Sequence, residues 1–261
     1  MILDAMVTAG GVPEPGDSLY EFSRGKSKAL IEIAGKLMAQ WVLDAISGSK
    51  SIERVVVVGV DSESGLTCAK PITFIPNQGG MLDNIRGAAH TLADQNPEGK
   101  HVLIVSSDIP TITSEMVDWA AEKVRPEDEL VYNVIEKSVM EKRFPNSERT
   151  YTKLKNIQVC GGDMNPAAIH TILSETGFWE KLAAARKNPL KQASLIGFDL
   201  LLLMLLRALT LEGASKRASK NLRLQARAIL CPYAEIGMDI DKVHHLEVVR
   251  HDLEARSSRL R

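Results

Sequence analysis

An acidic turn directly follows an apolar run in the middle of the chain. The run Val102–Val105 ends in SSDIPTIT (106–113), which places Asp108 beside Pro110. In open α/β sheets, ligands bind at the carboxyl ends of the strands, where a carboxylate can hold a divalent metal and a proline can fix the turn that aims it. A turn acid can equally satisfy backbone donors. Asp108 is therefore a candidate metal ligand, with a structural turn residue as the alternative.

A second acidic motif, GMDID (237–241), lies near the end of the sequence and follows a segment that we expect to be a strand. Asp239 and Asp241 could each supply an oxygen to the metal site of Asp108. An aspartate in this position also favours the start of a helix, and Asp241 suits that cap better. We therefore predict metal ligation by all three acids, with Asp108 and Asp239 as the principal pair.

A glycine-containing turn and a lysine could bind phosphate groups near these acids. The turn is TAGG (8–11), after the first expected strand, and its loop ends in GKSKAL (25–30), which contains Lys28. Glycines let backbone amides approach a ligand, and a lysine can meet phosphate oxygens. The spacing fits neither the GxGxxG fingerprint nor the GxxxxGK[ST] P-loop, so a standard dinucleotide or P-loop ATPase site is not indicated.

Composition limits the classes of protein to which the chain can belong. Its 261 residues are 44% hydrophobic and 25% charged, and its net charge of -1 provides no global attraction to nucleic acid. Its cysteines, Cys68, Cys160 and Cys231, form no CxxC pair. The N-terminus lacks the basic and apolar regions of a signal peptide. We expect a cytoplasmic globular protein without a disulfide framework or a nucleic-acid partner.

The hydrophobic pattern alternates between strands and helices. Expected strands cover residues 2–8, 54–60, 72–75, 101–105 and 228–231. Helical spacing of apolar residues follows in between, and Thr113 is the expected N-cap of one such helix. Strands separated by helices imply right-handed βαβ crossovers. The predicted fold class is a doubly wound, mostly parallel α/β sheet.

The segment 166–227 has a different character, because it is helical in pattern and contains no clear strand. We predict an α/β domain over 1–165 and 228–261, interrupted by this helical insertion. Its residues 181–227 contain ten Lys or Arg and only two acids, next to the apolar stretch 200–206. Three uses remain open for the insertion: a helical hairpin with a basic solvent face, a peripheral membrane contact with anionic lipid, or a homodimer contact.

The motifs together resemble a known family. TAGG, GKSKALIEIAGKLMAQWVLDAI, SSDIP and GMDIDKVHHL occur here in the same order as in the MobA-like nucleotidyltransferases, over about 1–163 and 228–254. The resemblance implies a GT-A, Rossmann-like fold. It also implies Mg²⁺-dependent transfer of a nucleoside monophosphate from a nucleoside triphosphate (NTP) to a small phosphorylated acceptor, with release of pyrophosphate.

The resemblance also assigns roles to individual residues. Lys28, Asp108 and Asp239 become the catalytic set. The nucleotide-binding residues become Ala9, Gly10, Gly11, Lys28, Gly79, Gly80 and Asn84. For Asn84, a solvent-facing helical amide is the alternative. The chain departs from the family pattern at Arg24, Ser27 and Leu37, where relatives often have an earlier arginine, a proline and a proline.

The acceptor is expected opposite the nucleotide, at the segment 140–156 and the GGD turn 161–163. Guanidinium groups match the geometry of phosphate, so this segment could bind an anionic acceptor. The acceptor-binding candidates are Arg143, Arg149, Tyr151, Lys153 and Gly162. A solvated charged loop is the alternative for each of them.

Two other classes of function remain. A GT-A glycosyltransferase that uses a nucleotide sugar would usually carry two acids in a DxD motif after the middle strand, whereas the turn here has only Asp108. A non-catalytic nucleotide-binding or membrane-docking protein would carry out no reaction, so it would not need Asp108 and Asp239 for catalysis. Both remain alternatives to the nucleotidyltransferase.

Overall fold

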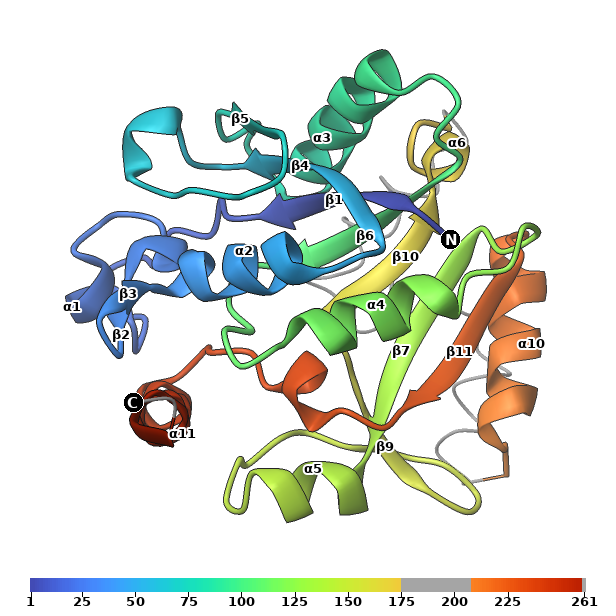
Figure 1. Ribbon diagram of the computed structural model, residues 1–261. Coiled ribbons are helices and arrows are strands. Elements are labelled where there is room, and N and C mark those ends of the chain that lie inside the picture. Colours follow the sequence, from blue (N-terminus) through green and yellow to red (C-terminus); the bar gives the residue numbers. More distant parts are fainter. Residues whose placement is uncertain (175–207, 260–261) are drawn as a thin grey trace.

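Four parallel strands form the first half of a central sheet (Figure 1). The structure is a computed structural model, and it describes residues 1–174 and 208–259. In spatial order the four strands are β5 (Ile72–Ile75), β4 (Ile52–Val58), β1 (Leu3–Thr8) and β6 (His101–Ser106). Each pair is parallel, as the predicted βαβ crossovers require.

Mixed pairing follows beyond β6 and brings the sheet to nine strands in the described residues. These five strands are β10 (Met164–Ala168), β7 (Leu130–Glu136), β9 (Gln158–Gly161), β8 (Thr152–Lys153) and β11 (Ala226–Cys231). β10 runs antiparallel to β6, and β11 runs parallel to β7. A separate small hairpin joins β2 (Glu32–Ile33) to β3 (Lys36–Leu37).

Helices pack on both faces of the sheet (Figure 1). One face is covered by α3 (Met81–Gln95) and α6 (Ile169–Ile172). The other face is covered by α2 (Met38–Gly48), α4 (Ser114–Glu122) and part of α11 (Val243–Arg259). The remaining elements are α1 (Tyr20–Ser23), α5 (Lys137–Arg143), α10 (Leu211–Leu222) and the short turns η1 (Lys28–Leu30), η2 (Ser62–Ser64) and η3 (Ala234–Gly237).

The central strands contribute side chains to two separate cores. Met6 of β1 packs with α3, whereas its neighbours Ala5 and Val7 pack with α2 and α4. Val56 and Val57 of β4 divide in the same way. Successive residues of a strand point to opposite faces, so a parallel strand that is buried on both faces needs an unbroken apolar run. Val55–Val58, within the strand predicted over 54–60, have this property.

The predicted fold class is confirmed, because the sheet is mixed but mostly parallel and has flanking helices. The expected strands at 2–8, 54–60, 72–75 and 101–105 correspond to β1, β4, β5 and β6. Thr113 occupies the N-cap position of α4, although its side chain makes no capping hydrogen bond.

The expectation of a helix from Pro166 is wrong, because Pro166 lies within β10 and is paired with Leu103 of β6. A central strand rarely tolerates proline, which cannot donate to the ladder. Here the ladder toward β7 is short, and side chains replace it. The N–H of Asn133 donates to Asn165 Oδ1 at 2.7 Å, and Asn133 Nδ2 donates to the carbonyl of Met164 at 2.6 Å.

The predicted insertion is described only in part. Its first residues belong to β10 and α6, and its last part contains α10, which packs along β11. The apolar stretch 200–206 and most of the basic segment lie outside the described residues, and so do the membrane and dimer contacts expected from them. Among the helices of the described residues, none is long and apolar enough to cross a membrane.

Candidate active site

Three carboxylates from distant parts of the sequence meet at the carboxyl end of β6. Asp108 follows β6, whereas Asp239 and Asp241 lie between η3 and α11. One side-chain oxygen of each acid lies within 4.8 Å of the other two. The backbone fixes this arrangement, because the N–H of Ile240 donates to the carbonyl of Asp108 at 3.0 Å. The fold thus brings together the two acidic motifs of the sequence.

Lys28 connects this carboxylate cluster to the glycine loop. Its Nζ lies 2.5 Å from Asp108 Oδ2 and 2.9 Å from Asp241 Oδ1, and its backbone N–H donates to the carbonyl of Gly11 at 2.8 Å. Burial alone lowers the pKa of Lys28, but the two carboxylates outweigh it and raise the pKa above its ordinary value. Lys28 therefore remains a cation beside the cluster.

Ser27 holds Lys28 in this position. Its hydroxyl donates to the carbonyl of Ala9 and accepts the N–H of Ala29 at 3.2 Å, so it caps η1. Ser27 is one of the positions at which the chain departs from the family pattern, because relatives often have proline there. In this chain the two hydrogen bonds of the Ser27 hydroxyl hold the backbone next to Lys28 against the glycine loop.

Arg149 is the second cation at the cluster. Its guanidinium forms an ion pair with Asp239, and both side chains are largely buried. Burial raises the pKa of Asp239, Asp241 raises it further, and Arg149 opposes the rise. Burial also acts to raise the pKa of Asp241, but its hydrogen bond with Asp239 and the charge of Lys28 lower it below the ordinary value. The two neighbouring acids therefore differ in their affinity for protons.

Asp163 adds a fourth acid; from the sequence, its GGD turn is expected to line the acceptor site, and Asp163 itself has no predicted metal-binding or catalytic role. Its N–H donates to the carbonyl of Ile236 at 2.8 Å, and its carbonyl accepts the N–H of Ser106 at 2.8 Å. Its backbone thus bridges the segments that lead to Asp108 and Asp239. Burial, followed by the charges of Asp239 and Asp108, raises the pKa of Asp163 well above its usual range.

The cluster fits a hard divalent cation. Such ions prefer carboxylate oxygens, and three carboxylates here present oxygens close to one another. In addition, Asp108 Oδ1 is buried and has no hydrogen-bond partner among the described residues. A buried carboxylate oxygen normally has a partner, so this atom is available to a ligand. Asp108, Asp239 and Asp241 would hold the ion.

The glycine loop lies against a second backbone turn and two amide side chains. A Cβ on Gly59 would lie 2.2 Å from the N and Cα of Gly10, so the turns after β1 and β4 touch through bare backbone. Asn77 Nδ2 donates to the carbonyl of Gly10 at 3.2 Å. Asn84 is 4% exposed, and its Oδ1 accepts the N–H of Gln78 at 2.7 Å. Asn84 therefore shapes the wall of the loop and does not face solvent.

The other nucleotide-binding candidates lie at the start of α3. Gly79 has a positive φ of 110°, and the N–H of Gly80 donates to Asp83 Oδ2 at 3.0 Å. This hydrogen bond satisfies one of the free donors at the N-terminus of α3. Asn77 links this turn to Gly10, so the loop of Ala9, Gly10 and Gly11 adjoins the turn of Gly79 and Gly80, and Asn84 lies in the first turn of α3 beside them.

The acceptor-binding candidates separate into two groups. Arg143 is held away from the cluster by 2.7 Å ion pairs with Glu235 and Asp252, and its guanidinium stacks over Phe144. Gly162 packs tightly, because a Cβ there would lie 3.0 Å from Ile236. These two residues support the fold, whereas Arg149 is the candidate that touches the carboxylate cluster.

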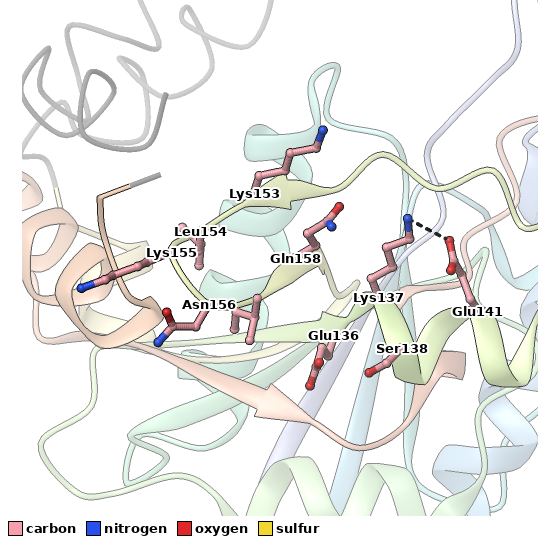
Figure 2. A pocket seen from close by; sticks show the side chains of 10 residues that line it. Glu136, Lys137, Ser138, Glu141, Lys153, Leu154, Lys155, Asn156 and Gln158 are labelled. Carbon is pink, nitrogen blue, oxygen red and sulfur yellow. Dashed lines mark ion pairs between the residues drawn. The ribbon is translucent and has the colours of Figure 1, made fainter. Parts of the chain in front are cut away.

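Two neighbouring cavities extend from Arg149 along α5. The first, of about 580 Å³, is lined by Arg149 and Tyr151 among other residues. The second, of about 510 Å³, is lined by Lys153 and is drawn in Figure 2. Lys137 and Glu141 line both cavities and form a 3.5 Å ion pair where the two meet. The candidates Arg149, Tyr151 and Lys153 thus border one continuous polar surface.

Comparison with known proteins identifies a family and a similar solved structure. The MobA-like NTP transferase domain family matches residues 21–196. A solved structure described as a hypothetical transferase from Thermus thermophilus shares 34% sequence identity with the chain, with a TM-score of 0.81. The match covers 94% of this chain and 100% of the other.

More distant solved structures share the fold. One is CMP:2-keto-3-deoxy-manno-octonic acid synthetase complexed with CTP, at 14% identity and a TM-score of 0.60, covering 98% of this chain and 100% of the other. Another is 4-diphosphocytidyl-2C-methyl-D-erythritol synthase from Anaerococcus prevotii, at 11% identity and a TM-score of 0.59, covering 97% and 96%. A search of curated proteins gave no match.

Proposed function

Because the chain belongs to the MobA-like NTP transferase family, it is a nucleotidyltransferase, and we propose that it transfers a nucleoside monophosphate to a small phosphorylated acceptor. In this reaction an acceptor phosphate oxygen forms a bond to the α-phosphorus of an NTP. The bond between the α-phosphorus and the bridging oxygen of the β-phosphate breaks, and pyrophosphate leaves. The acceptor is of the kind found in sugar phosphates and polyol phosphates.

One observation carries this proposal. Lys28 reaches from the glycine loop to Asp108 and Asp241, so a cation suited to phosphate and a carboxylate cluster suited to a divalent metal lie in the same site. Phosphoryl transfer needs mainly positioning and charge neutralisation, and these groups provide both. A site that only bound a nucleotide would not need three carboxylates near the phosphates.

Each residue has a distinct role in the proposed reaction. Asp108, Asp239 and Asp241 would hold Mg²⁺, which when bound supplies charge neutralisation to the phosphates. Lys28 opposes the negative charge that builds on the transferring and leaving phosphates. The backbone of Gly10 and Gly11 lies beside the nucleotide phosphates. The acceptor phosphate is already ionised near neutral pH, so the reaction requires no strong general base.

We propose that the acceptor binds on the polar surface next to Arg149. Its guanidinium can form two parallel hydrogen bonds to the phosphate that attacks, while it remains close to Asp239. Tyr151 and Lys153 border the cavities beyond it and would contact the remainder of the acceptor. We assign Arg149 to the reacting phosphate and Lys153 to a more distant part of the same molecule.

CTP is the first nucleotide to test. Two solved structures with the same fold are CMP:2-keto-3-deoxy-manno-octonic acid synthetase complexed with CTP and 4-diphosphocytidyl-2C-methyl-D-erythritol synthase. Comparison of the four common NTPs measures the preferred base. The proposal also places the enzyme in the cytoplasm, in agreement with its three free cysteines.

Pyrophosphate release tests the proposal. Purified protein is mixed with Mg²⁺, each of four NTPs and a panel of sugar and polyol phosphates. We expect release that requires one NTP and one acceptor, and Asp108→Asn should abolish it while the melting temperature remains close to that of the wild type. Asp44→Asn is the control, because Asp44 pairs with Lys36 at the surface.

The outcomes separate the classes of function. Transfer of the sugar from a nucleotide sugar, with release of the nucleotide and without any NTP, would favour a glycosyltransferase. Stabilisation by an NTP without turnover of any acceptor would favour a binding protein. Full activity of Asp108→Asn would refute the proposed mechanism.

A further inference from the structure

A buried histidine joins the two loops that carry the charged groups of the site. His245, in the first turn of α11, is only 3% exposed. The backbone N–H of Asp241 donates to its Nδ1 at 3.4 Å. On the other side of the ring, Nε2 lies 3.1 Å from the backbone carbonyl of Ser147. One imidazole thus connects the Asp241 segment to the loop that leads to Arg149.

The two partners define the tautomer of the ring. A backbone N–H can only donate, so Nδ1 must accept from Asp241. A carbonyl can only accept, so Nε2 must carry the proton that it donates to Ser147. A neutral imidazole with the proton on Nε2 satisfies both contacts. No other side chain of similar size offers an acceptor and a donor at these two positions, and an apolar residue would offer neither.

The loop that His245 contacts has an unfavourable backbone conformation. Ser147 is 1% exposed and lies between two residues with positive φ, Asn146 at 65° and Glu148 at 49°. This left-handed region is uncommon for residues other than glycine, and it persists where the surroundings enforce it. The next residue is Arg149, whose guanidinium pairs with Asp239. The hydrogen bond from His245 holds the strained turn immediately before this arginine.

We propose that His245 is a positioning residue, which fixes the distance between Arg149 and the carboxylate cluster by anchoring both loops to one rigid ring. The inference rests on the proposed function, in which Arg149 binds the acceptor and the acids bind the metal. His245 touches neither of these ligands. It acts through Asp241 on one side and through Ser147 on the other.

Two conservative variants separate the two contacts. The Oδ1 of asparagine stands where Nδ1 stands in histidine, so His245→Asn keeps an acceptor for Asp241 and loses the bond to Ser147. The Nε2 of glutamine stands where Nε2 stands in histidine, so His245→Gln keeps a donor to Ser147 and loses the acceptor for Asp241. His251→Asn, at an exposed position of the same helix, is the matched control.

Amide hydrogen exchange tests the inference without any ligand. In His245→Asn, exchange in peptides over 146–150 should rise about tenfold, the factor that corresponds to one lost hydrogen bond, while exchange around Asp241 remains as in the wild type. In His245→Gln the pattern should be reversed. A residue that served only as core packing would loosen both segments in both variants.

Manganese binding provides a second measurement, followed by electron paramagnetic resonance with Mn²⁺ alone. His245→Gln should bind Mn²⁺ about tenfold more weakly, the typical effect of losing a residue that orients a metal ligand. His245→Asn should remain within about twofold of the wild type, since it keeps that orienting contact. If turnover is established, His245→Asn should raise the KM for the acceptor and leave the KM for the NTP unchanged.

The outcomes distinguish the two proposals. Identical exchange of both segments in wild type, His245→Asn and His245→Gln would overturn the positioning role, whatever the metal data show. Loss of protection in both segments in both variants would overturn it as well. If the wild type binds no Mn²⁺, the proposed metal chemistry fails, and the exchange pattern still decides the role of His245.

Discussion

The ammonium of Lys28 lies 2.5 Å from the carboxylate of Asp108, between the N-terminal loop and the turn after β6. The same ammonium reaches Asp241, so a single cation contacts two of the three acids that would bind a metal. A lysine in this position both competes with a metal for oxygens and offers a charge to phosphates. Its removal should therefore affect metal binding and turnover in opposite directions.

Lys28→Met is expected to strengthen Mn²⁺ binding, because two carboxylates lose their competing partner. It is also expected to lower kcat by about 100-fold, the typical effect of removing one preorganised charge at a transferring group. Lys26→Met, at an exposed position of the same loop, should change neither quantity. Mn²⁺ titration and pyrophosphate release measure the two effects. A parallel loss of both would contradict the assigned role.

Gly10→Ala should destabilise the protein by about 1–3 kcal/mol, as is typical when an extra methyl group enters a packed region. The added Cβ would lie 2.5 Å from Asn84 Nδ2 and 3.3 Å from Asn77 Oδ1. At Gly11 the nearest atom would be Lys28 Cε at 3.5 Å, an ordinary contact, so Gly11→Ala should leave the melting temperature unchanged. Thermal unfolding without nucleotide compares the two variants. Equal melting temperatures of Gly10→Ala and Gly11→Ala would show that the loop moves to accommodate a methyl group at Gly10.

Arg149→Lys should raise the KM for the acceptor by about tenfold and leave the KM for the NTP unchanged, because lysine keeps the charge but loses the planar fork. Arg143→Lys serves as a comparison. Arg143 bridges Glu235 and Asp252, so its loss should lower the melting temperature without changing either KM. If Arg143→Lys raised the KM for the acceptor and Arg149→Lys did not, Arg143 and not Arg149 would be the residue that binds the acceptor. Initial-rate kinetics and thermal unfolding provide both readouts.

Asp128→Asn should lower the free energy of unfolding at neutral pH by about 2 kcal/mol, as expected for hydrogen bonds to a charged group. Asp128 is buried, and its Oδ2 lies 2.6 Å from Arg227 of β11. Burial raises the pKa of Asp128, but Arg227 and the backbone N–H of Arg125 outweigh it and lower the pKa below 3.8. A depressed pKa means that the ionised form stabilises the fold.

This stabilisation is fully present above pH 3.8 and disappears as the pH falls through the lowered pKa of the folded state. The difference in stability between wild type and Asp128→Asn should therefore shrink below this pH. Urea denaturation at several pH values measures it, with Glu127→Gln, at an exposed neighbouring position, as the control. A difference that stayed constant down to strongly acidic pH would exclude Asp128 as its source.

The sequence predicted the parallel half of the sheet because local pattern determines it. The second half of β4, Val55–Val58, is buried on both faces and is apolar at every position, so its valines identify the strand without knowledge of its neighbours. β7 lacked this signal, because Asn133 occupies a fully buried position within it. Asn133 is satisfied by Asn165 and Met164, which only the folded sheet brings near.

The site also contains residues that local sequence pattern indicates and residues that only contacts across the fold reveal. Asp108 and Asp239 were predictable because each follows a strand or turn in a recognisable motif, and the fold places both in one cluster. Asp163 and His245 were visible in the sequence as a turn acid and a helical histidine. Their significance depends on contacts across the fold, Asp163 with Ile236 and His245 with Ser147. No local pattern encodes such contacts.

The order of the site residues along the chain has a consequence for synthesis. The glycine loop, Lys28 and Asp108 are synthesised before Asp239, Asp241 and the helix that contains His245. A nascent chain therefore carries the glycine loop and Lys28 before it can complete the acidic cluster. If these acids hold the metal as proposed, a chain that ends before Asp239 should not turn over nucleotide, and activity should begin only after α11 has docked.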